Sequence, residues 1–287
     1  MSIKKAVIAV AGYGTRFLPY TKAVPKAMLP ILNKPANQVV AEEVVDSGIT
    51  DILFIVGYKK EVIEQHFSKA DELETVLIEK HKSEFYNLIK YPEQFANVSF
   101  VEQTELNGTA KAIELAKDFV KNDPFVILFG DDVMYNDGEP VTKQLINVYE
   151  KTGKCVVGCK HVAKEDVPKY ASVEYDNVSN NVYNVTKITE KPPIEKVKST
   201  LSPLGRYLVT PDIFEIIANL KSGVNNEYQL TDALSALASN NKLVALDFEG
   251  KRYDFGSQLG CVMANIDFAL RSENREELIS YIKSLDI

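Results

Sequence analysis

The sequence predicts an α/β fold with a mainly parallel sheet that is flanked by helices. Apolar runs of strand length recur along the first half of the chain, at residues 6–11, 51–56, 98–103 and 125–129. Stretches with helical spacing of apolar residues lie between these runs. This alternation is typical of a parallel sheet that helices cover on both faces. The order of the strands does not follow from the pattern.

The first predicted helix illustrates the helical pattern. Val39, Val40, Val44 and Val45 are spaced so that they share one helical face, and Gly48 follows them as a C-terminal cap. The strand predicted next along the chain begins only a few residues later, which leaves room for a short turn.

After about residue 150 the pattern loosens, and strand-like segments outnumber helical ones. The other helices predicted before this point cover residues 61–67 and 109–121. The strands predicted after it lie at residues 156–157, 171–175, 182–188 and 204–209. Helices return at residues 212–220, 227–239, 259–271 and 273–285. No repeat, low-complexity segment or linker interrupts the chain, which favours one extended domain over two independent ones.

Composition narrows the classes of function. The chain has 287 residues and a formal net charge of −7, which argues against a nucleic-acid binder that works through bulk positive charge. A few placed cations can still serve an anionic substrate. No apolar run approaches the length of a membrane span. Three scattered cysteines, Cys155, Cys159 and Cys261, are expected to be reduced thiols of a cytoplasmic protein.

A glycine-rich turn follows the first predicted strand. It begins Ala11-Gly12-Tyr13-Gly14-Thr15, and its glycines allow backbone N–H groups to approach a ligand, while a helical turn after it offers a positive end to phosphate. A dinucleotide-binding loop would need a third glycine where Phe17 stands, and the Gly-Lys-Ser/Thr of a P-loop is absent. The turn therefore suits phosphate without matching either common motif.

Three cations follow within eleven residues of the turn. Arg16, Lys22 and Lys26 lie in a loop that also contains Pro19 and Pro25, and prolines lower the entropic cost of ordering a loop around a ligand. Clustered cations beside a glycine-rich turn in an acidic protein indicate a polyphosphate site.

These residues resemble the signature of the nucleotidyltransferases that activate sugar 1-phosphates, and among them the bacterial uridylyltransferases that use glucose 1-phosphate. The resemblance covers nearly the whole chain. The other motifs that match, in the family's order, are Gln103 with Gly108, Gly130-Asp131-Asp132, Glu190-Lys191-Pro192, Gly205-Arg206-Tyr207, residues 226–233 and residues 253–256. Separate motifs in the right order are far more specific than any one of them.

The resemblance implies a Rossmann-like mixed sheet with a smaller sugar-binding β portion, all within one nucleotidyltransferase domain over residues 1–287. Residues 1–150 would form the nucleotide-binding portion, 151–256 the sugar-binding portion and 257–287 the C-terminal helices. The implied reaction joins UTP and glucose 1-phosphate, giving UDP-glucose and pyrophosphate by Mg²⁺-assisted in-line attack on the α-phosphorus. Relatives suggest a homodimer or homotetramer, and neither nucleic acid nor a membrane is expected as a partner.

The resemblance also assigns the residues that handle metal and sugar. Asp131 ends a buried strand, where an open α/β sheet presents its ligand site, and Mg²⁺ prefers one or two carboxylates together with substrate phosphates. Asp131 and Asp254 are the implied metal ligands. The implied sugar contacts are Asp132, Glu190 and Gly205.

The remaining assignments concern the nucleotide and the phosphates. Arg16 and Lys26 would hold the triphosphate, and Lys191 would position the attacking sugar phosphate; the resemblance marks these three as the catalytic residues. The implied nucleotide contacts are Ala11, Gly12, Gly14, Thr15, Gln103 and Gly108. The amide of Gln103 both donates and accepts, as reading a pyrimidine edge requires, and Gly108 would let the chain pass close to the base.

Several positions depart from the uridylyltransferase pattern. Ala27 stands where the family usually has Glu, and Ala171 stands where it prefers Gly near the sugar. The segment 103–111 is slightly closer to the thymidylyltransferases. These departures leave open a thymidylyltransferase or another sugar specificity, and also a catalytically weak regulatory paralogue that binds UDP-sugar. An NAD-linked dehydrogenase is a more distant hypothesis.

Overall fold

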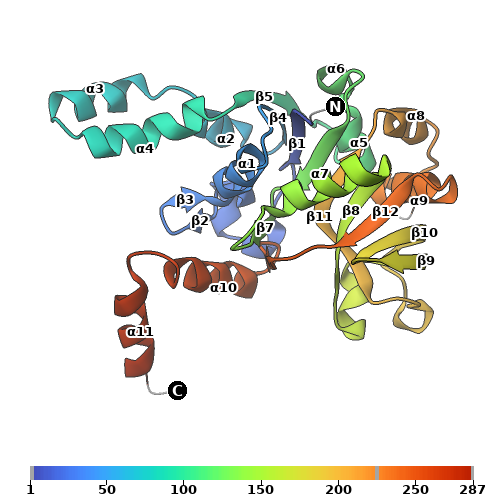
Figure 1. The fold of residues 1–287 in the computed structure, drawn as a ribbon. Coiled ribbons are helices and arrows are strands. Elements are labelled where there is room, and N and C mark those ends of the chain that lie inside the picture. Colours follow the sequence, from blue (N-terminus) through green and yellow to red (C-terminus); the bar gives the residue numbers. More distant parts are fainter. Residues whose placement is uncertain (1–2, 224–225, 286–287) are drawn as a thin grey trace.

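A central sheet organises the chain in a computed structural model that describes residues 3–223 and 226–285 (Figure 1). Nine strands form this sheet. In spatial order they are β5 (Asn97–Glu102), β4 (Asp51–Val56), β1 (Lys5–Ala9), β6 (Phe125–Phe129), β11 (Leu201–Val209), β8 (Cys155–His161), β12 (Leu243–Asp247), β10 (Val182–Glu190) and β9 (Ala171–Ser179). Two smaller sheets pair β7 (Asp132–Tyr135) with β13 (Lys251–Asp254) and β2 (Pro30–Ile31) with β3 (Lys34–Pro35).

The predicted mixed sheet is confirmed. The strands β5, β4, β1 and β6 run parallel to one another, and β12 runs parallel to β8. Strand β11 is antiparallel to both of its neighbours, β6 and β8, and the β9–β10 pair completes the antiparallel part. Strand β11 therefore joins the strands that precede residue 150 to those that follow it, in one continuous sheet.

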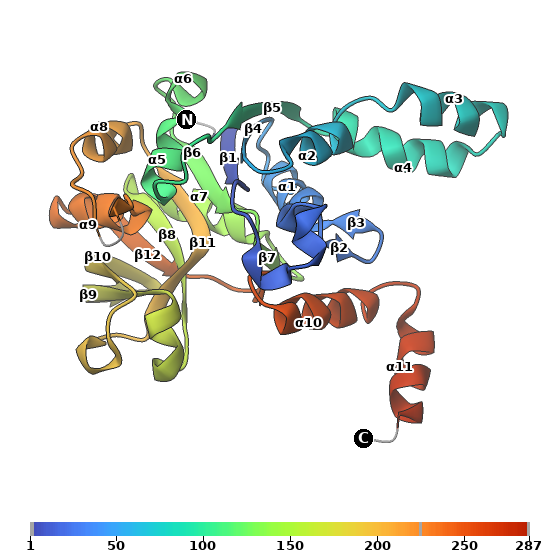
Figure 2. The ribbon, with the colours of Figure 1, turned by 180° about the vertical axis from the view of Figure 1, so that it is seen from behind.

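Helices cover both faces of this sheet (Figures 1 and 2). The helices in the described part of the chain are α1 (Ala36–Asp46), α2 (Lys60–His66), α3 (Asp71–Glu79), α4 (Ser83–Gln94), α5 (Thr109–Glu114), α6 (Lys117–Val120), α7 (Val141–Thr152), α8 (Asp212–Ala218), α9 (Leu230–Ser239), α10 (Gln258–Ala269) and α11 (Arg275–Ser284). Helices α1 and α7 contribute to the apolar core on one face, and α5, α8 and α9 to the core on the other. No helix in the described part of the chain has the length and apolar character needed to cross a membrane.

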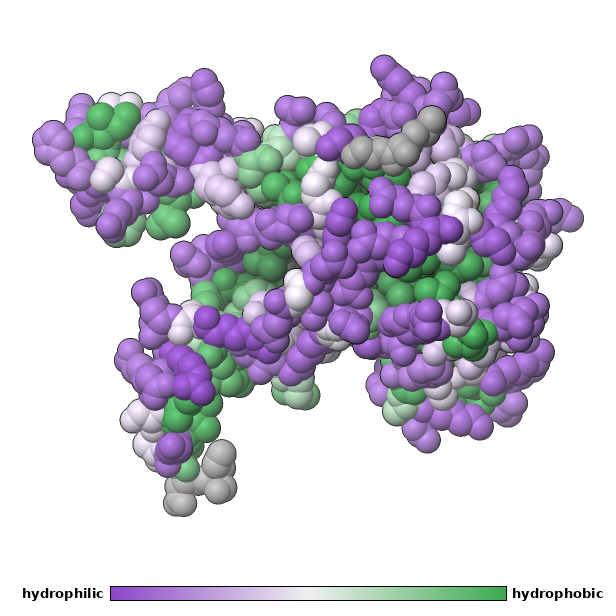
Figure 3. All heavy atoms as spheres, viewed as in Figure 1, coloured by the Kyte–Doolittle hydropathy of each residue, from purple (hydrophilic) through white to green (hydrophobic). Residues whose placement is uncertain are grey.

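Two helical arms extend away from the sheet. The hairpin α3–α4 projects beyond β5, and the pair α10–α11 leads away from the body to the C-terminal end (Figures 1 and 2). The space-filling view shows apolar side chains on the surface of both arms (Figure 3).

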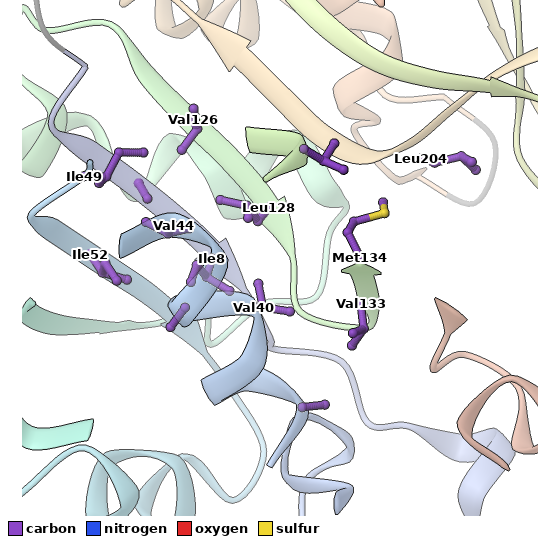
Figure 4. Close-up of a cluster of buried hydrophobic side chains, with 14 of the residues drawn as sticks. Ile8, Val40, Val44, Ile49, Ile52, Val126, Leu128, Val133, Met134 and Leu204 are labelled. Carbon is purple, nitrogen blue, oxygen red and sulfur yellow. The ribbon is translucent and has the colours of Figure 1, made fainter. Parts of the chain in front are cut away.

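The strands alternate their side chains between the two cores. In β1, Ala6 and Ile8 belong to one core and Val7 to the other, as the two-residue period of a strand requires. Figure 4 shows part of the first core, in which Ile8 and Leu128 from the sheet lie near Val40 of α1. Burial on both faces is the reason why these strands are continuous apolar runs in the sequence.

The structure differs from the predicted elements in three respects. The helix predicted over 109–121 is divided into α5 and α6. The helix predicted over 227–239 begins only at Leu230, because the backbone of Tyr228 hydrogen-bonds to Asn107 and Ala110 instead. Elements outside the predicted ranges are β2, β3, α3, α4, β7, α7, β12 and β13.

A buried ion pair ties β11 to two helices. The Arg206 guanidinium, only 1% exposed, contacts Glu43 of α1 with a shortest distance of 2.6 Å between Nη2 and Oε2. The same carboxylate accepts hydrogen bonds from the backbone N–H and the hydroxyl of Thr142 in the first turn of α7, at 3.0 and 2.7 Å. Glu43 therefore satisfies donors from two elements at once, and removing either charge would leave the other buried and unpaired.

We expect Arg206→Met to lower the free energy of unfolding by about 3–5 kcal/mol, the usual cost of leaving one buried charge without its partner. Urea denaturation followed by circular dichroism measures this loss. The double variant Glu43→Leu, Arg206→Met should lose less than Arg206→Met alone, because no isolated charge remains. Lys242→Ala, which breaks an exposed ion pair with Asp212, serves as a control and should leave stability nearly unchanged.

Candidate active site

The glycine-rich turn after β1 is held by its own residues. Gly14 has φ +65° and precedes a single 3₁₀ turn over Thr15–Phe17. The hydroxyl of Thr21 donates to the carbonyl of Gly14 at 2.9 Å. A Cβ atom on Gly14 would lie 2.8 Å from the Cβ of Lys26. Glycine is therefore required at this position both by its φ angle and by the close approach of Lys26.

An ion pair between Lys26 and Asp131 connects the loop that follows β1 with the segment that follows β6. The ammonium of Lys26 lies 2.5 Å from Oδ2 of Asp131. Burial by itself raises the pKa of Asp131, but the charge and hydrogen bond of Lys26 outweigh it and hold that pKa below its ordinary value. Asp131 is therefore ionised at neutral pH, and its charge is available to a cation.

The pairing of β7 with β13 brings the carboxylate of Asp254 next to that of Asp132. Asp254 lies directly opposite Asp132 in the antiparallel register, and the N–H of Phe255 donates to the carbonyl of Asp131 at 2.8 Å. Arg252 lies between the two acids: its Nε donates to Asp132, and its Nη2 lies 3.6 Å from Asp254. The β7–β13 pair thus places the carboxylates of Asp132 and Asp254 around one guanidinium.

Asp254 is further oriented by its neighbours. Its Oδ1 accepts a hydrogen bond from the N–H of Gly256 at 2.7 Å, and its Oδ2 accepts one from the hydroxyl of Tyr170 at 3.3 Å. Arg16 donates to the carbonyl of Gly256 at 2.9 Å. The loop that follows β1 is therefore linked to the turn that follows β13, although 240 residues separate them in sequence.

Gly205 is required by Asp132. It has φ +66°, and a Cβ atom built on it would lie 2.3 Å from Oδ2 of Asp132 and 2.7 Å from its Cβ. Asp132 is only 7% exposed. Burial raises the pKa of Asp132 to about 6, against the opposing charge of Arg252.

Glu190 and Lys191 end β10 at the same site. Burial raises the pKa of Glu190, whose Oε2 accepts a hydrogen bond from the hydroxyl of Thr231 at 3.0 Å. Lys191 has φ +39°, and its N–H donates to the carbonyl of Tyr170 at 2.7 Å. A non-glycine residue in this region carries backbone strain, which is typical of functional sites. Its exposed ammonium is free to approach a phosphate.

Gln103 and Gly108 lie on a loop at the end of β5. Gln103 is 9% exposed, and its side-chain amide donates to the carbonyl of Glu105 at 3.0 Å. Gly108 has φ +114°, and a Cβ atom there would lie 2.3 Å from the carbonyl oxygen of Tyr228. The requirement for glycine at 108 therefore comes from the chain that crosses it, a constraint that the sequence alone does not reveal.

Two adjoining cavities contain most of these residues. The first, of about 390 Å³, is lined by Ala9, Ala11, Gly12, Gln103, Leu106, Gly108, Thr109, Ala112, Phe129, Asp131, Glu227 and Gln229. The second, of about 260 Å³, contains the polar side chains of Arg16, Asp131, Asp132, Tyr170, Glu190, Lys191, Arg252 and Asp254 together with Gly205. The two cavities share Thr109, Phe129, Asp131 and Gln229, so Asp131 lies where they meet.

The predicted site residues are distributed between these two cavities. Ala11, Gly12, Gln103 and Gly108 line the first cavity, and the predicted sugar residues line the second together with Lys191, Arg16 and both predicted metal ligands. Lys26 reaches the junction through Asp131. Gly14 and Thr15 are not among the lining residues of either described cavity; in this structure Gly14 shapes the turn.

Several residues at the site lie outside the predicted set. Arg252 and Tyr170 surround Asp254, while Glu227, Gln229 and Thr109 line the first cavity. One signal for Arg252 was present in the sequence: it stands two residues before Asp254, so a strand places both side chains on the same face. Glu227 and Gln229 lie within the matched motif at residues 226–233, whereas the places of Tyr170 and Thr109 at the site depend on contacts between segments distant in the chain.

The two departures at alanine are both buried. Ala27 is 6% exposed and belongs to the first apolar core, whereas Ala171 is 1% exposed and lines the second cavity. With alanine at both positions, the charged residues of the site make the contacts described above.

This fold and this paired cavity define a nucleotidyltransferase, and the chain belongs to that family: residues 5–267 match the nucleotidyl transferase family model. A UTP–glucose-1-phosphate uridylyltransferase of Staphylococcus saprophyticus is 44% identical over the full length of both chains. One of Staphylococcus epidermidis is 43% identical over 99% of both.

Solved structures agree with this assignment. A UDP-glucose pyrophosphorylase complexed with UDP-glucose is 36% identical with a TM-score of 0.86, covering 94% of this chain and 100% of the other. A UTP-bound UGPase from Acinetobacter baumannii is 31% identical with a TM-score of 0.91, covering 99% of this chain and 100% of the other. The resemblance noted in the sequence motifs is thereby confirmed over nearly the whole chain.

The raised pKa of Asp132 predicts a pH dependence of stability. Because the folded-state pKa of about 6 lies above the ordinary value of 3.8 for an aspartic acid, the folded chain binds a proton more tightly than the unfolded chain does. The resulting stabilisation is present below about pH 4 and is lost as the pH rises through 6. Urea denaturation from pH 4 to 7 should show this loss in the wild type and less of it in Asp132→Asn. Parallel pH profiles for the two proteins would contradict the assignment to Asp132.

Proposed function

We propose that this protein transfers a uridylyl group from UTP to glucose 1-phosphate, giving UDP-glucose and pyrophosphate. The observation that carries the proposal is the pair of cavities that meet at Asp131, one of about 390 Å³ next to the glycine-rich turn and one of about 260 Å³ rich in charged side chains. The names of the full-length relatives, at 43–44% identity, support the same reaction. They do not favour a thymidylyltransferase or a regulatory paralogue.

The nucleophile needs no general base. A phosphate monoester is largely ionised at neutral pH, so an oxygen of glucose 1-phosphate attacks the α-phosphorus in line and pyrophosphate leaves. The protein must then align the two substrates and neutralise charge. Lys26 and Arg16 are suited to the triphosphate and the departing pyrophosphate, and Lys191 to the attacking phosphate. Glu190 and Asp132 are suited to accept hydrogen bonds from sugar hydroxyls.

Mg²⁺ is the proposed cofactor, with Asp131 and Asp254 as its ligands. Three or more metal-binding side chains do not gather anywhere in residues 3–223 and 226–285. Two carboxylates that line the same cavity, with side chains 36% and 29% exposed, fit Mg²⁺, which completes its coordination with water and substrate phosphates. When bound, the ion would neutralise phosphate charge. A cytoplasmic location, where nucleotides and sugar phosphates are metabolised, is part of the same proposal.

A homodimer or homotetramer is also proposed, supported by the surface of α10. Leu259, Val262, Met263 and Ile266 follow helical spacing along one face, and they are 63%, 54%, 50% and 38% exposed. Figure 3 shows apolar atoms along the arm that α10 forms with α11. Contiguous exposed apolar surface of this kind favours association.

A pyrophosphate-release assay with UTP and glucose 1-phosphate tests the reaction, and parallel assays with dTTP and with other sugar 1-phosphates test its specificity. We expect Lys26→Ala and Lys191→Ala each to lower kcat/KM by at least about a hundredfold, because each removes a cation from phosphate charge. Lys187→Ala, on the exposed side of β10, is the matched control. Near-wild-type turnover in both site variants would rule out the assigned roles.

The double variant Leu259→Glu, Met263→Glu should shift the protein toward monomer in sedimentation-velocity experiments, because it introduces charge into the apolar face of α10. Lys187→Glu changes surface charge elsewhere and should leave the oligomeric state unchanged. A wild-type protein that sediments as a monomer at micromolar concentration would contradict the proposed association.

A further inference from the structure

Residues 226–229, here called the strap, cross the loop that carries Gly108. The N–H of Tyr228 donates to the carbonyl of Asn107 at 2.9 Å, and the N–H of Ala110 donates to the carbonyl of Tyr228 at 2.9 Å. These two backbone hydrogen bonds fix the strap against residues 107–110. The absence of a side chain at Gly108 is what permits the contact, because a Cβ atom there would lie 2.3–2.4 Å from the oxygen and nitrogen of Tyr228.

A side-chain contact holds the strap as well. The ammonium of Lys111 lies 5.1 Å from the centroid of the Tyr228 ring, within the range of a cation–π interaction. Lys111 also pairs with Glu114 at 2.7 Å, which keeps its side chain on the outer surface of α5. The strap is therefore attached to α5 by both backbone and side chain.

Because Tyr228 is attached to residues 107–110, its two neighbours in sequence lie at the first cavity. Glu227 and Gln229 both line the first cavity. The side-chain amide of Gln229 donates to Oε2 of Glu227 at 2.8 Å, and its carbonyl accepts from the hydroxyl of Thr109 at 3.3 Å. The hydroxyl of Thr109 in turn accepts from the N–H of Leu230 at 2.9 Å, where α9 begins. A chain of hydrogen bonds thus orients the Glu227 carboxylate.

The carboxylate of Glu227 can accept further hydrogen bonds from a ligand. Within residues 3–223 and 226–285 its side chain takes part in that single hydrogen bond and in no ion pair. A carboxylate accepts hydrogen bonds, and its negative charge repels a triphosphate, so the part of a nucleotide that it binds must offer a hydrogen-bond donor. On a uridine nucleotide the donors are the ribose hydroxyls and the imide N–H of the base. Glu227 lines the first cavity and is not among the lining residues of the second.

We propose that Glu227 is a specificity-determining residue that accepts a hydrogen bond from a donor on the nucleoside of the nucleotide substrate, and that Lys111 and Tyr228 are positioning residues for it. This inference rests on the proposed uridylyltransferase function. It adds a contact on the strap to those assigned to Gln103 and the glycine-rich turn.

Steady-state kinetics of Glu227→Gln with three nucleotides tests the contact. We expect KM for UTP to rise about tenfold, the usual effect of weakening a hydrogen bond to a charged group, while kcat and KM for glucose 1-phosphate stay within twofold. The direction is diagnostic, because removing a negative charge that merely lies near the triphosphate would lower KM. Glu215→Gln, on the exposed side of α8, makes the same charge change and should have no effect.

The nucleotide analogues identify the donor. If a ribose hydroxyl is the donor, the substitution raises KM for UTP and 3-methyl-UTP but not for 2′,3′-dideoxy-UTP. If the imide is the donor, it raises KM for UTP and dideoxy-UTP but not for 3-methyl-UTP. An unchanged or lower KM for UTP, or an equal rise with all three, overturns the inference. A wild-type protein that does not use UTP would instead overturn the proposed function.

The positioning role is tested at Lys111. Lys111→Met should raise KM for UTP several-fold with kcat unchanged, and Lys111→Arg, which keeps a cation over the ring, should restore it. In the Glu227→Gln background Lys111→Met should add little, because the residue that it positions has already lost its charge. Full additivity of the two substitutions, or equal KM values for Lys111→Met and Lys111→Arg, would overturn this part of the proposal.

Discussion

The insertion of β11 between β6 and β8 is the constraint on which the rest of the structure depends. This strand joins the parallel strands of the first half to the strands of the second half. Its Arg206 is buried against Glu43 on one face of the sheet, whereas Gly205 makes room for Asp132 at the site. One strand therefore carries both the ion pair that locks α1 and α7 and the close contact that shapes the charged cavity.

The second cavity contains both positively and negatively charged side chains and is not uniformly positive. Lys26, Arg16, Arg252 and Lys191 lie near the carboxylates of Asp131, Asp132, Asp254 and Glu190. Substrate phosphates entering such a site meet cations that are already oriented, so little reorganisation accompanies binding. A protein with a formal net charge of −7 can thus recognise polyanions, because the local arrangement of charges matters more than their sum.

Prediction from the sequence succeeded where the signal was local. The strands β1, β4 and β6 are apolar and buried on both faces. The turn at Gly12 and Gly14 follows the first of them directly, so neighbouring residues contain the whole pattern. Prediction failed for β12 and β13, whose pairing partners are distant in sequence, and it also missed the helices α3, α4 and α7. It also placed the start of α9 too early, since it could not include the backbone contacts of Tyr228 with the loop at 107–110.

The sequence by itself determined the α/β class and the family and predicted a phosphate site in the first loop, because motifs and periodicity are properties of short segments. Tertiary structure decided which segments lie next to each other. It placed Asp254 opposite Asp132, set Arg252 between them and brought Glu227 to the first cavity. The physical reason is that strand register and backbone crossings depend on packing between segments more than one hundred residues apart, which no local pattern records.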